Sequence, residues 1–79
     1  MNLKIKAFGI SKEIVGGREI EFQVDGETIS ELRKELNAKF PALLDLNSLF
    51  IAVNNRYMEE ETIIKESDEI ALIPPVSGG

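Results

Sequence analysis

Two stretches near the start of the chain alternate between apolar and polar residues. Residues 3–8 and residues 19–24 each place their apolar side chains at every second position, which is typical of a strand with one face on a core. Residues 11–15, between them, predict a single helical turn that ends at Gly16 and Gly17. Two strands this close in sequence predict an antiparallel hairpin with a widened loop.

An amphipathic helix is predicted to begin at Thr28. Thr28 and Glu31 have the spacing of a capping box, in which the threonine oxygen accepts an amide of the first turn and the glutamate reaches back to the cap amide. The apolar residues that follow share one helical face: Ile29, Leu32, Leu36 and Phe40. Pro41 ends the helix, because a residue before proline is pushed out of the helical region.

The second half of the chain predicts three further strands. Residues 49–53 and the short segment 56–58 are joined by an asparagine turn, and residues 69–73 are nearly all apolar, which favours a central place in the sheet. Residues 42–48 are predicted to form an irregular connection. With a single helix after the first two strands, this order predicts an α+β fold in which one main helix packs on a mixed sheet of about five strands.

Length and composition narrow the chemistry. Seventy-nine residues, 43% of them hydrophobic and 29% charged, suit one folded domain without a deep cleft of its own. Cysteine and histidine are absent, which excludes disulfides, thiol nucleophiles, imidazole bases and the usual structural zinc sites. The serines therefore have no histidine partner, and no glycine-rich phosphate loop is present. We expect neither an enzyme complete in itself nor a bound metal or cofactor.

The net charge of −5 argues against two classes of partner. A protein that grips nucleic acid carries the opposite charge, and so does one that binds an anionic membrane surface; a partner with a basic pocket fits better. The apolar runs are far shorter than the ~20 residues of a membrane span, and the first residues alternate without the apolar block of a signal peptide. We therefore expect a cytoplasmic protein that binds neither nucleic acid nor membrane.

The last residues differ from an ordinary strand end. Pro74 and Pro75 directly follow an apolar strand, and their fixed φ favours an extended, semi-rigid lead-out. Gly78 and Gly79 have no Cβ, so this backbone can enter a narrow slot, and Gly79 carries an ionised α-carboxylate. A stiff spacer, a slim neck and an activatable carboxylate are typical of an acyl carrier. The alternative is a frayed tail without function, since domain ends are often rich in glycine.

The order of elements and the ending Pro-Pro-Val-Ser-Gly-Gly resemble the small, sulfur-carrying subunits of molybdopterin synthase, which belong to the ubiquitin-like β-grasp family. The likeness spans essentially the whole chain. It also includes the first strand up to Phe8, the turn at residues 11–15 and the capped helix. With this resemblance we expect a β-grasp domain at residues 1–74 and an extended tail at residues 75–79.

The resemblance implies a function at the tip of the tail. The carboxylate of Gly79 is expected to be adenylated by an ATP-using enzyme similar to those that activate ubiquitin, and then to take sulfur from a persulfide donor as a thiocarboxylate. Pro75, Val76, Ser77, Gly78 and Gly79 are expected to enter the basic active site of a large synthase subunit. There the resemblance implies that they deliver sulfur to a pterin precursor, and that two deliveries build the dithiolene that holds molybdenum or tungsten. Family complexes contain two small and two large subunits.

The alternation along the strands also predicts a docking surface. Phe8 alternates with the core residues of the first strand and Ile73 with those of the last, so both point to the open face of the sheet, where Tyr57 can join them. An exposed apolar cluster usually marks a partner site, and the family resemblance favours contact with the large subunit here. The alternative is that Phe8 and Ile73 curl round a sheet edge into a satellite core.

Three other functions stay open at this point. A ubiquitin-like modifier would join Gly79 to a target lysine through an isopeptide bond. A thiazole-pathway sulfur carrier shares the fold and the Gly-Gly ending, although such carriers tend to be shorter and to lack the Pro-Pro step. The third is a plain interaction module whose tail is inert.

Overall fold

The first two strands pair as the antiparallel hairpin that their alternation predicts. In the computed structural model, which describes residues 1–75, β1 (Asn2–Ala7) lies against β2 (Glu19–Gln23). Helix α1 (Ile10–Val15) occupies the loop between them. It ends at Gly16, whose φ of +92° lies in the left-handed region that glycine adopts without strain.

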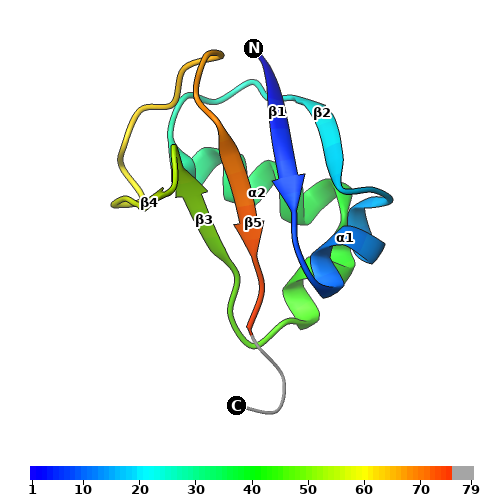
Figure 1. Cartoon of the computed structure of the whole chain (residues 1–79). Helices are drawn as coiled ribbons and strands as arrows, with labels where there is room; N and C mark the ends of the chain where they lie inside the picture. Colours follow the sequence, from blue (N-terminus) through cyan, green and yellow to red (C-terminus); the bar gives the residue numbers. More distant parts are fainter. Residues whose placement is uncertain (76–79) are drawn as a thin grey trace.

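The remaining strands complete a five-stranded mixed sheet in the order β2-β1-β5-β3-β4. β3 (Phe50–Val53) pairs antiparallel with both β4 (Arg56–Tyr57) and β5 (Ile70–Ile73), whereas β5 runs parallel to β1. Figure 1 shows the result, with β5 in the middle of the sheet. The predicted central place of the last strand is therefore confirmed, and the chain leaves the sheet from its centre.

The main helix, α2 (Ile29–Lys39), lies across one face of this sheet (Figure 1). Its predicted capping box is present: Oγ1 of Thr28 accepts the amide of Glu31 at 3.1 Å, and the Glu31 carboxylate accepts the amide of Thr28 at 3.2 Å. The same carboxylate accepts the amide of Glu27 at 3.0 Å. These amide donors hold the pKa of Glu31 below its ordinary value. The start of the helix is thus fixed by local chemistry.

The segment after α2 differs from the prediction, and the turn between β3 and β4 adds detail to it. Pro41 follows α2 as predicted, but the connection expected to be irregular begins as a short 3-10 helix, η1 (Pro41–Asp45). Proline suits its first turn, where no N–H partner is needed. The β3–β4 turn places Asn54 and Asn55 at φ of +53° and +66°, the conformation that two-residue hairpin loops require and asparagine tolerates.

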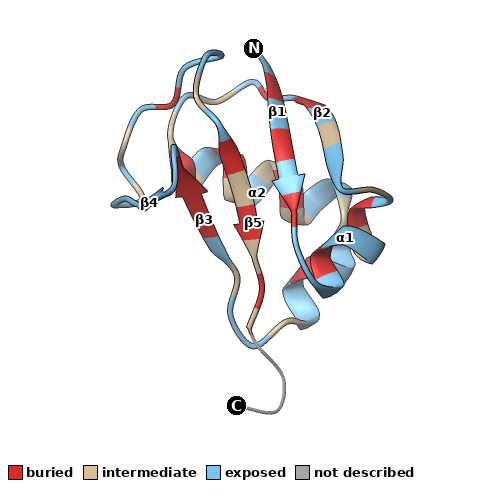
Figure 2. Cartoon of the chain, viewed as in Figure 1, coloured by how far each residue is buried: buried red, intermediate tan, exposed pale blue. Residues whose placement is uncertain are grey.

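The core lies between α2 and the face of the sheet that α2 covers. Figure 2 shows buried and exposed residues alternating along β1. The largest fully buried apolar side chains come from both layers: Leu3, Ile5, Val24, Ile29, Leu32, Leu36, Ile70 and Leu72. Each such side chain contributes about 1.5–3 kcal/mol by leaving water. In the described part of the chain, no helix covers the opposite face of the sheet. Among residues 1–75, no helix has both the length and the hydropathy to cross a membrane.

Candidate functional site

The open face of the sheet carries an apolar patch at the end where β5 leaves it. Phe8, Tyr57 and Ile73, the three residues predicted for a docking surface, border one hollow of about 300 Å³ together with Ala52 and Ala71. Phe8 is 51% exposed and Tyr57 65%, whereas Ile73 is half-buried; the exposure of Phe8 argues against the alternative that buries it in a satellite core. The structure brings the three predicted residues together, and their contact with a partner stays a prediction.

Phe50 extends this surface and is missing from the sequence prediction. It is half exposed, pairs in register with Ile73, and places its ring centroid 5.2 Å from that of Tyr57 at an angle of 41°. The signal was available in the alternation, because Phe50 precedes Ile51 of the buried face. We call Phe8, Phe50, Tyr57 and Ile73 the apolar patch.

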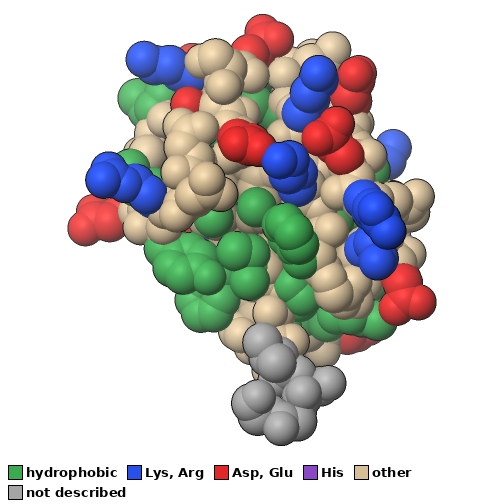
Figure 3. Space-filling model, in the orientation of Figure 1, with side chains coloured by type: hydrophobic (Ala, Val, Ile, Leu, Met, Phe, Trp, Pro, Cys, Tyr) green, Lys and Arg blue, Asp and Glu red, His purple; other side chains and the backbone are tan. Residues whose placement is uncertain are grey.

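Charged residues cover the other half of the open face. The Lys6 ammonium forms an ion pair with Glu69, whose hydrogen bond and charge raise the pKa of Lys6. On the neighbouring strand, Glu19 pairs in register with Lys6 and Glu21 with Lys4. Figure 3 shows the division: green apolar side chains gather near the end of β5, and blue and red ones lie above them. The open face therefore has an exposed apolar area bordered by charged residues.

The residue that leads out of β5 rests on a glycine. Pro74 is buried, and a Cβ built on Gly9 would lie 3.2 Å from Cγ of Pro74. Gly9 also has φ +56° and ψ −137°, a combination that costs other residues about 1–3 kcal/mol of strain. Glycine is thus required here twice, by its own backbone and by the proline above it. Sequence reasoning did not single out Gly9, because its partner lies at the other end of the chain.

Ser11 holds the turn that carries Gly9. Its buried Oγ donates to the carbonyl of Phe8 at 2.5 Å and accepts the amide of Phe8 at 3.2 Å. The Phe8 amide also donates to the carbonyl of Leu72 at 3.2 Å. A buried hydroxyl with these partners is fully satisfied. The hydrogen bond from the Phe8 amide to Leu72 joins the end of β1 to the end of β5, next to the apolar patch.

The predicted tail residues are only partly described. Pro75 is half-buried directly after Pro74, whereas Val76, Ser77, Gly78 and Gly79 lie outside the described residues. Within residues 1–75, no group of three acidic side chains is placed to hold a metal ion. The described part of the chain therefore offers a surface for binding. This apolar surface lies beside β5, the strand that leads to the tail.

Comparison with known proteins agrees with the geometry over nearly the whole chain. The ThiS family matches residues 5–79. A molybdopterin synthase sulfur carrier subunit of Arabidopsis thaliana is 32% identical over 81 residues, covering 100% of this chain and 84% of the relative.

Two solved structures have the same fold. Subunit 1 of the molybdopterin-converting factor of Helicobacter pylori, solved in a protein–protein complex with subunit 2, has a TM-score of 0.68 and 28% identity, with 100% of both chains covered. The small archaeal modifier protein 1 of Methanosarcina acetivorans has a TM-score of 0.78 and 30% identity, covering 99% of this chain and 96% of the other. The expected ubiquitin-like β-grasp fold is thereby confirmed. With relatives of this length and identity, the chain belongs to the ThiS family, among the molybdopterin synthase sulfur carrier subunits.

Proposed function

We propose that the chain is the sulfur carrier of a molybdopterin synthase and that its reacting group is the α-carboxylate of Gly79. The observation that carries this proposal is a juxtaposition: the strand that ends in Pro-Pro-Val-Ser-Gly-Gly leaves the sheet beside the apolar patch. A partner that covers the patch has the tail within reach. Residues 1–74 then serve as the body that docks and residues 75–79 as the arm that reacts.

The chemistry proceeds in balanced steps. An activating enzyme of the kind that charges ubiquitin joins the Gly79 carboxylate to AMP and releases pyrophosphate from ATP. The terminal sulfur of a persulfide donor displaces AMP, and a thiol reduces the resulting S–S bond to leave the thiocarboxylate. The thiocarboxylate sulfur forms a bond to a pterin precursor, water then cleaves the bond between this sulfur and the Gly79 carbonyl carbon, and the regenerated carboxylate can be loaded again for a second delivery. We place these steps in the cytoplasm, where ATP is available to the activating enzyme.

The large synthase subunit is the proposed partner of the apolar patch. The Helicobacter pylori relative is solved in complex with subunit 2 of its converting factor, which supports an equivalent pairing here. The net charge of −5 favours a basic partner and speeds its encounter. This chain supplies no catalytic side chain in the proposal; it positions a thiocarboxylate, and the partner surrounds the reacting atoms.

The proposal is tested by the mass of the protein. After incubation with the cognate activating enzyme, ATP and a persulfide donor, intact-mass spectrometry should show the gain of one oxygen-to-sulfur exchange, located on Gly79 by fragmentation. Omission of ATP is the control and should leave the mass unchanged. An unchanged mass with an enzyme that adenylates another carrier would contradict the proposal.

Replacement of Phe8 by glutamate should weaken binding to the large subunit. Phe8 is half exposed and lines the hollow of the patch, and loss of an apolar anchor in a buried interface costs more than about 1 kcal/mol, or roughly fivefold in Kd. Isothermal titration calorimetry measures this effect. The matched control is Ile63→Glu, which adds the same charge at an exposed isoleucine outside the patch and should bind normally. If Phe8→Glu binds normally too, or unfolds, the patch assignment is wrong.

A second function is favoured by one comparison, the similarity to a small archaeal modifier protein. The same carboxylate of Gly79 would then form an isopeptide bond with a lysine of another protein. Digestion of cell extracts and a search for glycine remnants of this chain on lysine side chains distinguishes the two. Remnants that are found with the full chain, and are absent when Gly79 is deleted, would establish protein modification alongside sulfur transfer.

A further inference from the structure

No strand of the described residues pairs with the outer edge of β2. β2 is the end strand of the sheet built by residues 1–75. Met1 and Val24 exchange two hydrogen bonds at 2.8 and 2.9 Å, and the Ala7 amide donates to the Arg18 carbonyl at 2.9 Å. Because such pairs alternate along an antiparallel ladder, the N–H and C=O groups of residues 19, 21 and 23 point away from β1. An extended segment can pair with this edge.

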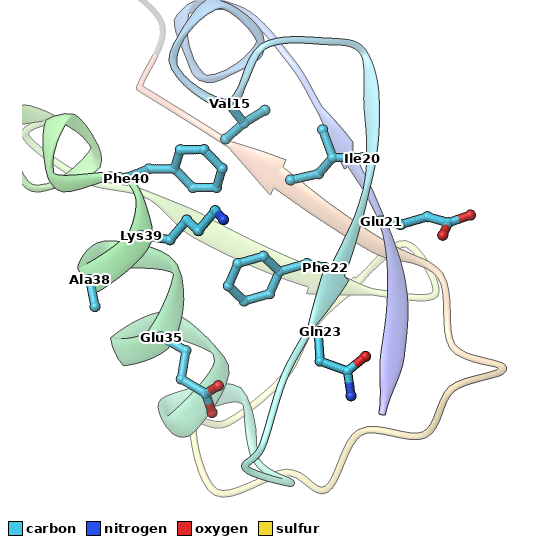
Figure 4. Close-up of a pocket in the computed structure, with 9 residues that line it drawn as sticks. All are labelled: Val15, Ile20, Glu21, Phe22, Gln23, Glu35, Ala38, Lys39 and Phe40. Carbon is cyan, nitrogen blue, oxygen red and sulfur yellow. The ribbon is translucent and has the colours of Figure 1, made fainter.

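A groove runs alongside the same edge, between β2 and α2. It has a volume of about 890 Å³, and its apolar lining includes Val15, Ile20, Phe22 and Phe40. Figure 4 shows these side chains directed into the space between strand and helix, while Glu21 points away from it. Ile20 and Phe40 remain half-buried. A strand added to β2 would place every second side chain over these residues and remove them from water.

Charge decides what kind of segment fits. On the open face of the sheet, the side chains of an added strand would lie beside Glu19 and Glu21. These two glutamates already face the lysines of β1, Lys6 and Lys4, across the strand pair. Basic residues continue this ladder, since opposite charges stabilise cross-strand neighbours and like charges destabilise them. Lys39 and Glu35 both line the groove, so its charges favour neither sign and its apolar side chains determine what fits there. A second copy of the chain is disfavoured, because antiparallel pairing of two β2 edges sets glutamates against glutamates.

We propose that the β2 edge and its groove form a second docking surface, which takes an extended partner segment of alternating apolar and basic residues. The apolar residues fill the groove, and the basic residues pair with Glu19 and Glu21. If β2 had only to be protected from self-association, its negative charges would be enough. An open apolar groove beside the strand does not protect it and is better explained by a partner. The sheet order sets β2 and the β3–β4 pair at opposite edges, so both surfaces can be occupied at once. This inference is independent of the sulfur chemistry.

The test uses the full chain labelled with ¹⁵N and two short peptides, one of alternating lysine and valine and one of alternating glutamate and valine. The lysine peptide should shift the amide signals of Glu19, Glu21 and Gln23 and leave those of Phe8 and Tyr57 in place. The glutamate peptide should leave all of them unchanged. Equal binding of both peptides, shifts confined to the apolar patch, or no shifts at millimolar peptide would each overturn the proposal.

A pair of charge variants separates local pairing from overall charge. Glu21→Lys should weaken binding of the lysine peptide by about fivefold and permit binding of the glutamate peptide. Glu61→Lys changes the net charge equally at an exposed position away from β2 and should bind the lysine peptide as the unaltered chain does. Equal losses in the two variants would reduce the effect to long-range attraction. Shifts of the same three amides with protein concentration, without peptide, would assign the edge to a second copy; this too contradicts the proposal.

Discussion

Deletion of Gly79 is expected to abolish sulfur loading and molybdopterin synthesis completely. In the proposed function the only reacting group is the α-carboxylate of this residue, and a chain shortened by one residue ends on Gly78, too short to bring its carboxylate to the same catalytic atoms. A displacement of about 1 Å already costs on the order of 100-fold in rate, and one residue spans about 3.3–3.6 Å when extended. Intact-mass spectrometry and an assay of molybdopterin measure the two losses.

The fold should survive this deletion. Pro74 is the last buried residue that the structure describes, five residues before the deleted one, so thermal unfolding should occur at the same temperature in both chains. Ser77→Ala is the matched control, because it alters a tail side chain and keeps the carboxylate in position; it should load sulfur normally. If cells supplied only with the shortened chain made molybdopterin at the normal rate, the proposed function would fall.

Replacement of Gly9 by alanine should impair both stability and delivery. The backbone at Gly9 has φ +56° and ψ −137°, and the new Cβ would lie 3.2 Å from the ring of Pro74. The strain costs about 1–3 kcal/mol, and the proline, which cannot flex far, must shift by a few tenths of an ångström. We expect a lower midpoint of thermal unfolding and, among the molecules still folded, a lower kcat for sulfur transfer.

Gly16→Ala separates these two effects. Gly16 also has a positive φ, of +92°, but a Cβ there meets nothing within 4 Å. Its substitution should cost about 1–2 kcal/mol of stability through the left-handed backbone alone and leave kcat unchanged. If both variants lose activity in proportion to the unfolded fraction, Gly9 supports the fold only and does not position the tail.

The features that the sequence predicts well are those set by near neighbours in the chain. The capping box needs only Thr28 and Glu31, three residues apart, and both of its hydrogen bonds form. The alternation of β1 follows from the two-residue period of a strand, and the same parity places Phe8 and Ile73 on the open face. The apolar character of residues 70–73 predicts the centre of the sheet.

The features that escape prediction depend on distant pairings. The alternation with Ile51 places Phe50 on the open face, but only its register with Ile73 brings it into the apolar patch. Gly9 is constrained by Pro74, which lies at the other end of the chain. The groove beside β2 is formed by β2 and α2 together, so neither element predicts it alone. The 3-10 helix after Pro41 was missed for another reason: its few residues carry no periodicity long enough to detect.

The parallel pairing of β1 with β5 has a consequence for how the carrier is recognised. Because β5, in the middle of the sheet, and its neighbour β1 come from opposite ends of the chain, half of the polypeptide cannot form half of this sheet, and the domain is expected to assemble in a single all-or-none transition. The four aromatic and aliphatic side chains that a partner would touch come from segments far apart in the sequence, so they meet only after that transition. Before that transition the chain lacks the surface that the proposed function assigns to the large subunit, so the synthase is expected to bind folded carriers alone.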